Sequence, residues 1–433
     1  GDTTAVGLAT EKVQHYLKGP RGTQVRLVVE RPGYTEPLRF TLTRDEIPLN
    51  TVIAHYMIDD VTGYIRLQRF AQTSAQEIRT AIDELRREGM TRLVFDLRDN
   101  GGGLLDQAYQ IADEFLPEGN MIVYTDSRHP NNRRQYRATA GGHFEAEPVM
   151  VLVNENSASA SEIVAGALQD HDRAFLVGRR TFGKGLVQQQ FQMSDGSVLQ
   201  MTVSRYFTPS GRLIQTPFVN GEGEEAYFES KRALRAAVED VVAPIGGLVD
   251  TGRLRGDVPD SLVFRTDGGR TVYGGGGVLP DYIVALDSVS APLRVVIGRN
   301  LDNDFARVHI EQLGERFRRE WSGRETEFAR SYQLDDATFG AFLDYAGTRG
   351  VQVVNTRPET LAPADTTQAA SLLVRSEVSA SRRDIETRIK AFMARRLFDT
   401  DAWYPVVGQI DPVIQAAMQQ WQTATTSLAQ ANR

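Results

Sequence analysis

Two short, mostly apolar runs, residues 93–97 with a single aspartate at Asp96 and the wholly apolar 149–153, constrain the fold of this chain more than any other feature. Short apolar runs bounded by polar and glycine residues predict strands that are buried on both faces, as in a parallel sheet covered by helices. Each run leads into a polar or glycine-rich turn and then into a helical pattern. Residues 51–207 are therefore expected to follow a βαβ construction.

The other elements follow from periodicity, capping boxes and turn residues. The expected strands are 23–30, 38–43, 64–67, 174–178, 186–192, 198–207 and 282–284. The expected helices are 10–17, 74–89, 103–115, 158–169, 229–241, 303–320, 336–346, 370–397 and 412–429. A linker rich in Pro, Asp and Thr at 357–367 divides the helical C-terminal part. The first 50 residues contain so few elements that they predict only half of a domain.

Composition excludes several classes of function. The 433 residues are 41% hydrophobic and 24% charged, which is typical of a globular protein of two to four domains. A net charge of −7 without a basic run gives no reason to expect a nucleic-acid partner. The absence of cysteine excludes disulfides and thiol catalysis, and none of the six histidines lies at metal-ligand spacing. No run approaches the ~20 apolar residues of a membrane span, and no signal peptide is visible.

The densest polar segment, residues 154–162, follows the second apolar run and contains three serines. A strand, a sharp turn and a helix start place a serine where free backbone N–H groups can hold an oxyanion. Serine at the start of a helix is also an ordinary N-cap, so this segment alone leaves both interpretations open. The glycine turn after the first run, 100–103, is equally open between an oxyanion-binding turn and a tight connection.

Lysine is rare in this chain. Only five of the 49 basic residues are lysines, and one of them, Lys184, lies between two glycines and apolar neighbours. A neutral lysine amine can accept a proton, whereas the guanidinium of arginine cannot. Because no histidine pattern offers a base, a serine hydrolase of this sequence would need another one.

Four segments together resemble the carboxyl-terminal processing (tail-specific) serine proteases: 96–103, 157–163, 181–185 and 205–212. Their order agrees with that family, as do the 25 residues from Ser159 to Lys184. The resemblance covers residues 1–288, and 256–284 resemble the long form with a helical C-terminal extension. It implies an α/β core of the ClpP/crotonase-like type at 51–288. It further implies the second half of a PDZ domain at 1–50 and an α-helical region at 289–433.

The resemblance also implies roles for particular residues. Ser159 would be the nucleophile, Lys184 its general base and Gln188 the residue that orients the lysine. The backbone N–H groups of Gly103 and Ala160 would form the oxyanion hole. Neither a metal nor a cofactor is expected. Asp170 occupies the position of an activity-linked aspartate in some members, although we favour a structural role for it here.

The implied substrates are polypeptides with apolar C-termini, bound as extended chains. The sequence leaves open whether an adaptor delivers them and whether the chain forms a homo-oligomer. The resemblance implies export, as to a periplasm. The alternative function is a non-catalytic module that binds peptides or hydrophobic ligands on the same fold. A fragment that is inactive without a complete PDZ domain and an acyl-CoA enzyme of related fold are further alternatives.

Overall fold

The computed structural model describes residues 4–30, 35–46, 49–216, 223, 225–229, 248–251, 260–285, 289–356 and 372–431. The side chains of 248–250 and 427–431 lie outside this description. The expected helix at 229–241 lies outside the described residues beyond its first position, and the linker at 357–367 lies entirely outside them.

The chain divides into two compact units, residues 1–50 and 51–433. The first unit contains one helix, α1 (Thr10–Leu17), and an antiparallel hairpin of β1 (Gln24–Val29) and β2 (Leu38–Thr43). None of its described side chains is buried. Arg44 joins the hairpin to the helix, because its Nε donates to the Leu17 carbonyl at 2.7 Å. Hydrogen bonds rather than a packed core therefore hold this unit together.

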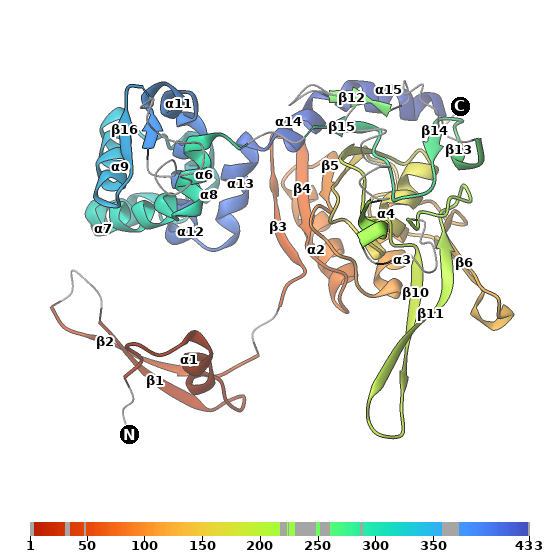
Figure 1. The fold of residues 1–433 in the computed structure, drawn as a ribbon, viewed down its shortest axis with the longest axis horizontal. Helices are drawn as coiled ribbons and strands as arrows, with labels where there is room; N and C mark the ends of the chain where they lie inside the picture. Colours follow the sequence, from red (N-terminus) through yellow and green to blue (C-terminus); the bar gives the residue numbers. More distant parts are fainter. Residues whose placement is uncertain are drawn as a thin grey trace. The chain divides into compact units, whose positions relative to one another are not determined.

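The second unit is built on a seven-stranded sheet with the order β12-β15-β9-β8-β5-β4-β3 (Figure 1). Its strands are β3 (Val52–Met57), β4 (Thr62–Leu67), β5 (Arg92–Asp96), β8 (Val149–Val153), β9 (Ala174–Gly178), β12 (Leu248–Asp250) and β15 (Tyr282–Val284). The five strands from β4 to β15 run parallel, and the edge strands β3 and β12 pair antiparallel to their neighbours. The mixed α/β core predicted from the two apolar runs is confirmed.

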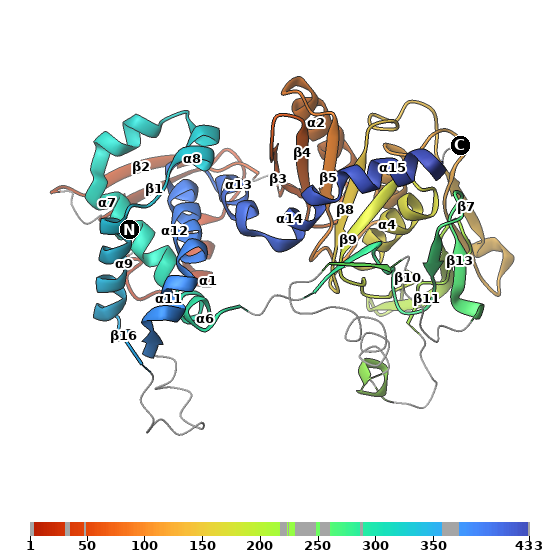
Figure 2. The same cartoon turned by 90° about the horizontal axis from the view of Figure 1, so that it is seen from above.

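Alternating side chains of the central strands enter two separate cores. In β8, Val149, Val151 and Val153 pack with α2 (Ser74–Arg87), α3 (Leu105–Asp113) and α4 (Ala160–Asp170). Met150 and Leu152 point to the other face, where α14 (Pro412–Gln419) and α15 (Trp421–Ala431) cover the sheet (Figure 2). Because both faces are covered, the strand is apolar at every position.

A smaller antiparallel sheet has the order β10-β11-β6-β7, comprising β10 (Leu186–Gln192), β11 (Val198–Phe207), β6 (Met121–Asp126) and β7 (Arg134–Arg137). The hairpin of β10 and β11 extends away from the core (Figure 1). Strand β10 begins two residues after Lys184, so this sheet fixes the position of the lysine turn. A further antiparallel pair joins β13 (Val263–Arg265) to β14 (Thr271–Tyr273).

The remaining helices share a third core. They are α6 (Ala291–Gly298), α7 (Leu301–Trp321), α8 (Glu325–Ser331), α9 (Asp336–Thr348), α11 (Arg375–Ala380), α12 (Arg382–Leu397) and α13 (Tyr404–Val407). Within the described residues, no helix combines the length and the apolar composition needed to cross a bilayer.

Two of the expected C-terminal helices were wrong in extent. The helix expected over 370–397 begins instead with a strand, β17 (Leu372–Val374), which pairs parallel to β16 (Gln352–Val354), and it is interrupted again at Ser381. The apolar run 372–374 satisfies its backbone in a ladder, which local periodicity cannot reveal. The helix expected over 412–429 is likewise two helices, separated at Gln420.

Candidate active site

Ser159 lies at the turn between β8 and α4, in an unusual backbone conformation. Its φ of 56° and ψ of −110° differ from the extended conformation that an N-cap residue normally adopts. A non-glycine residue in such a conformation is strained and persists only where the surrounding structure holds it. The neighbouring serines are fully buried: Ser157 Oγ donates to the Leu97 carbonyl at 2.8 Å, and Ser161 Oγ to the Asn100 carbonyl at 2.9 Å. Ser159 alone of the three is partly exposed.

The glycine turn after β5 lies directly against Ser159. A Cβ atom on Gly102 would lie 2.7 Å from the Ala158 carbonyl oxygen and 2.8 Å from the Ser159 Cβ, so only glycine permits this approach. Gly103 has a φ of 151° and lies opposite Phe70 in an isolated β-bridge. The Phe70 N–H donates to the Gly102 carbonyl, and the Leu104 N–H donates to the Phe70 carbonyl. Among the described residues, the backbone N–H groups of Gly103 and Ala160 donate to no protein acceptor. Both predicted oxyanion donors are therefore free.

Glu162 connects the serine turn to the lysine turn. Its Oε2 accepts the backbone N–H groups of Ser159 and Lys184, each at 2.9 Å. Its Oε1 accepts the Thr181 hydroxyl and the Gly183 N–H, each at 2.6 Å. Burial raises the pKa of Glu162 to about 7, although these four donors act in the opposite direction. The carboxylate thus joins two segments that lie more than 20 residues apart in the sequence.

Tyr206 of β11 adds a second connection between the same two turns. Its buried hydroxyl contacts the Ser159 carbonyl at 3.1 Å and also the Lys184 carbonyl. Burial, followed by the charge of Glu162, raises the pKa of Tyr206 well above its ordinary value, so the hydroxyl keeps the proton that it donates. Glu162 and Tyr206 both belong to segments that carried the family resemblance, but the sequence assigned neither of them a role. The Ser-x-x-Glu spacing was the available signal for Glu162, and it suggested only helix capping.

Asp99 links the glycine turn to the loop that precedes Ser159. Its φ is 61°, and its carboxylate accepts hydrogen bonds from the Asn154 and Asn156 amides at 2.8 and 2.9 Å. The Asp99 N–H donates in return to Asn154 Oδ1 at 2.9 Å. Burial would raise the pKa of Asp99, but the two asparagines and Arg66 hold it below its ordinary value. This carboxylate is therefore ionised at neutral pH.

Gln188 lies on β10, next to a bulge between Val187 and Gln188. Its side chain is exposed, and its Oε1 accepts a hydrogen bond from Gln200 Nε2 at 3.0 Å. Lys184 is partly buried on the preceding turn. The structure thus brings the backbones of Ser159 and Lys184 together, whereas the side chain of Gln188 pairs across the hairpin.

Asp170 lies at the end of α4, where it is buried against Arg212. Its carboxylate accepts the Ser210 N–H at 3.0 Å, the Ser210 hydroxyl at 2.7 Å and the Arg212 guanidinium. Arg212 is itself fully buried. This ion pair anchors the segment after β11 and fits the structural role that we favoured for Asp170.

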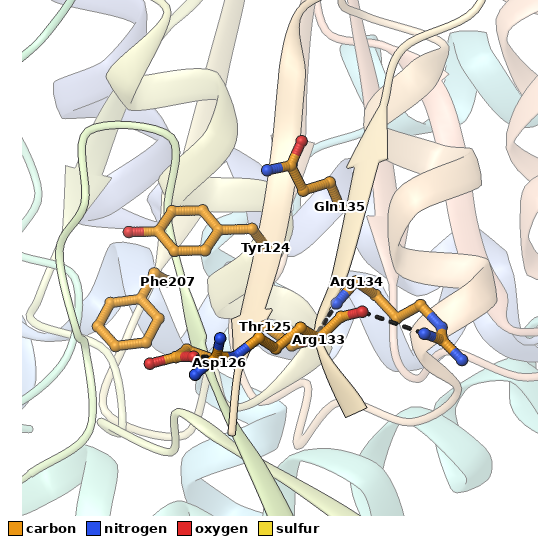
Figure 3. A pocket seen from close by; sticks show the side chains of 7 residues that line it. All are labelled: Tyr124, Thr125, Asp126, Arg133, Arg134, Gln135 and Phe207. Atoms are coloured by element: carbon orange, nitrogen blue, oxygen red, sulfur yellow. Dashed lines mark hydrogen bonds and ion pairs between the residues drawn. The ribbon is translucent and has the colours of Figure 1, made fainter. Parts of the chain in front are cut away.

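A pocket of about 600 Å³ opens on the smaller sheet (Figure 3). The rings of Tyr124 and Phe207 stack there with centroids 5.2 Å apart, and Arg133 pairs with Asp126 at 2.8 Å. None of the predicted site residues lines this pocket. In the part of the chain that the structure describes, no group of three or more His, Cys, Asp or Glu residues could hold a metal.

Comparison with known proteins defines the class of this site. Residues 61–221, which include all three turns, match the model of peptidase family S41. The chain is 43% identical over 208 residues to a carboxyl-terminal-processing protease of Synechocystis sp., an alignment that covers 47% of each protein. It is 40% identical over 203 residues to a carboxy-terminal-processing protease of Bartonella bacilliformis, with 46% of each protein covered.

Among solved structures, a photosystem II D1 C-terminal processing protease matches with a TM-score of 0.36 and 34% identity. That match covers 48% of this chain and 57% of the other. The chain spans about half the length of the curated relatives it matches.

The three turns therefore lie within the region that matches a peptidase family S41 domain. The chain carries a peptidase family S41 domain and is related to the carboxyl-terminal-processing proteases.

Proposed function

We propose that this chain is a serine endopeptidase that cleaves polypeptides near their C-termini. Ser159 is the nucleophile, Lys184 is the general base, and Gln188 orients the lysine once substrate is bound. One observation carries the proposal: a strained, partly exposed Ser159 shares the carboxylate oxygen of Glu162 with the backbone of Lys184. The names of the relatives supply the class of reaction and of substrate.

The proposed reaction is acyl transfer in two steps. Ser159 Oγ attacks the scissile carbonyl carbon as its proton passes to the neutral Lys184 amine. The carbonyl oxygen becomes an oxyanion, which the free N–H groups of Gly103 and Ala160 stabilise. The C–N bond then breaks, and the lysine ammonium gives its proton to the leaving amine. Water hydrolyses the resulting ester, with Lys184 again acting as the base.

The finer assignments follow from the same resemblance. We propose that residues 51–288 form a core of the ClpP/crotonase-like type and that 1–50 are the second half of a PDZ domain. The substrates are polypeptides with apolar C-termini in an exported, periplasm-like compartment. An adaptor that delivers them and a homo-oligomeric state are compatible with the proposal and are not needed for the chemistry.

The test compares cleavage of an unfolded model protein with an apolar C-terminus by the wild-type chain and by Ser159→Ala. Ser379→Ala is the matched control, because Ser379 is exposed and donates to its own helix at Arg375. We expect the wild type and the control to cleave and Ser159→Ala to be inactive. Labelling by a fluorophosphonate, which reacts with activated serines, should likewise require Ser159. Equal labelling and cleavage by Ser159→Ala would disprove the assignment.

A further inference from the structure

The C-terminal helix α14 reaches the peptidase core through its N-cap residue, Asp411. The Asp411 Oδ1 accepts the N–H groups of Val413 at 2.9 Å and Ile414 at 3.1 Å, which is ordinary capping. The same carboxylate also binds Arg98 Nη1, at 3.0 Å through Oδ1 and at 2.8 Å through Oδ2. One side chain therefore caps a C-terminal helix and pairs with a residue 313 positions earlier in the chain.

Arg98 is held between two carboxylates. Its Nε and Nη2 bind Asp96 at 3.0 and 2.6 Å, and its Nη1 faces Asp411. The Arg98 side chain is only 10% exposed. Burial would lower the pKa of Arg98, but Asp96 and Asp411 raise it well above its ordinary value. The guanidinium is thus charged, and the loss of either carboxylate would leave part of it without an acceptor.

Arg98 lies close in the chain to the glycine turn of the candidate site. Arg98 immediately precedes Asp99, where the chain turns through a positive φ into the glycine segment 100–103. Asp99 is bonded to Asn154 and Asn156 of the loop before Ser159. Asp411 is therefore connected to both turns of the candidate site through its ion pair with Arg98, the peptide bond from Arg98 to Asp99 and the hydrogen bonds of Asp99.

Packing fixes Asp411 itself. Val413, Ile414, Ala417, Trp421 and Ala424 are buried against the sheet face formed by Tyr64, Val94, Met150 and Leu152, among others. Arg92 of β5 lies over the Trp421 ring, 4.9 Å from its centroid. Helices α14 and α15 lie over strands β8 and β9 of the core in Figure 2. The N-cap that binds Arg98 is therefore attached to a helical layer whose apolar side chains are buried against the sheet.

We propose that Asp411 is a positioning residue, which holds Arg98 and thereby the turn 97–103 that carries the Gly103 N–H. Helices α14 and α15 then belong to the catalytic unit, as its second covering layer. The catalytic consequence rests on the proposed protease function, whereas the positioning of the turn does not.

The test uses Asp411→Asn, because asparagine caps a helix as well as aspartate but removes the charge that faces Arg98. The matched control is Asp335→Asn, at the N-cap of α9, where the carboxylate accepts the Thr338 N–H at 2.8 Å. Hydrogen–deuterium exchange of peptides that cover 97–104 reports directly on the turn. We expect exchange there to rise about tenfold in Asp411→Asn and to match the wild type in Asp335→Asn.

Peptide cleavage provides the second measurement. Because the turn acts on the transition state, Asp411→Asn should lower kcat about tenfold and leave KM within about twofold. Unchanged exchange at 97–104 would overturn the proposal that Asp411 positions the turn. Raised exchange with an unchanged kcat would overturn its catalytic consequence. If the wild type cleaves no better than Ser159→Ala, the protease function fails, and the exchange experiment still decides whether Asp411 positions the turn.

Discussion

The backbone N–H groups of Ser159 and Lys184 donate to one and the same oxygen, Oε2 of Glu162, each at 2.9 Å. Two residues that the proposed reaction requires are thus held by an acceptor that takes no part in bond making. Because Glu162 is fully buried, water cannot replace its hydrogen bonds if they are lost.

Glu162→Gln should lower kcat about 100-fold. The substitution turns one carboxylate oxygen into an amide NH₂ group, which cannot accept the backbone N–H groups that this oxygen binds in the wild type. The matched control is Glu77→Gln. Glu77 also accepts two backbone N–H groups, from Thr51 at 2.7 Å and Val52 at 2.9 Å, but it lies at the start of α2. The control should lose about 1 kcal/mol of stability and keep its activity within about twofold. Equal kinetic effects of the two substitutions would argue against a special role for Glu162.

The pH dependence of stability should also report on Glu162. Its pKa in the folded state is raised from 4.5 to about 7, so the folded protein binds more protons than the unfolded chain between these values. The stability that this group contributes is complete below about pH 4.5 and is lost as pH rises through about 7. We therefore expect the free energy of unfolding of the wild type, measured with urea, to fall more from pH 5 to pH 8 than that of Glu162→Gln. A constant difference between the two proteins would mean that Glu162 does not titrate in this range.

Lys184→Arg should fold normally and lose cleavage at least about 100-fold, because guanidinium cannot accept the serine proton. Circular dichroism and thermal unfolding check the fold. Lys18→Arg, at an exposed position of the first unit, supplies the control and should cleave like the wild type. A Lys184→Arg variant with substantial activity would exclude Lys184 as the base.

The three glycines after Asn100 should differ sharply in their tolerance of alanine. A Cβ atom on Gly101 would meet nothing within 4 Å, so Gly101→Ala should retain activity within about threefold. Gly102→Ala would bring a methyl group against Ser159 at a φ of 97°, and Gly103→Ala would place one against the Phe70 carbonyl. Both should lower kcat by about 100-fold or more, because the oxyanion donor moves. Similar rates for all three variants would remove this turn from the site.

The local sequence was sufficient to predict those elements whose structure depends on the residues of a single segment. The runs 93–97 and 149–153 predicted buried strands from their short length and apolar composition, and the predicted strand bounds at 38–43, 149–153, 174–178, 186–192 and 198–207 are those of the structure. The family resemblance rested on short segments of the same kind, and it led to the peptidase S41 class.

Only the tertiary structure determined the features that depend on contacts between residues far apart in the sequence. Residues 372–374 became a strand because a partner 20 residues earlier was available, and residues 412–426 became a layer of the core because the second sheet face needed a cover. Glu162 looked like a capping residue until the fold brought Gly183 and Lys184 to it. The sequence predicted a helix over 412–429, but nothing in its pattern pointed to an ion pair between Asp411 and Arg98. Hydrogen bonds and ion pairs act over about 3 Å in space, and the sequence does not record which distant residues come that close.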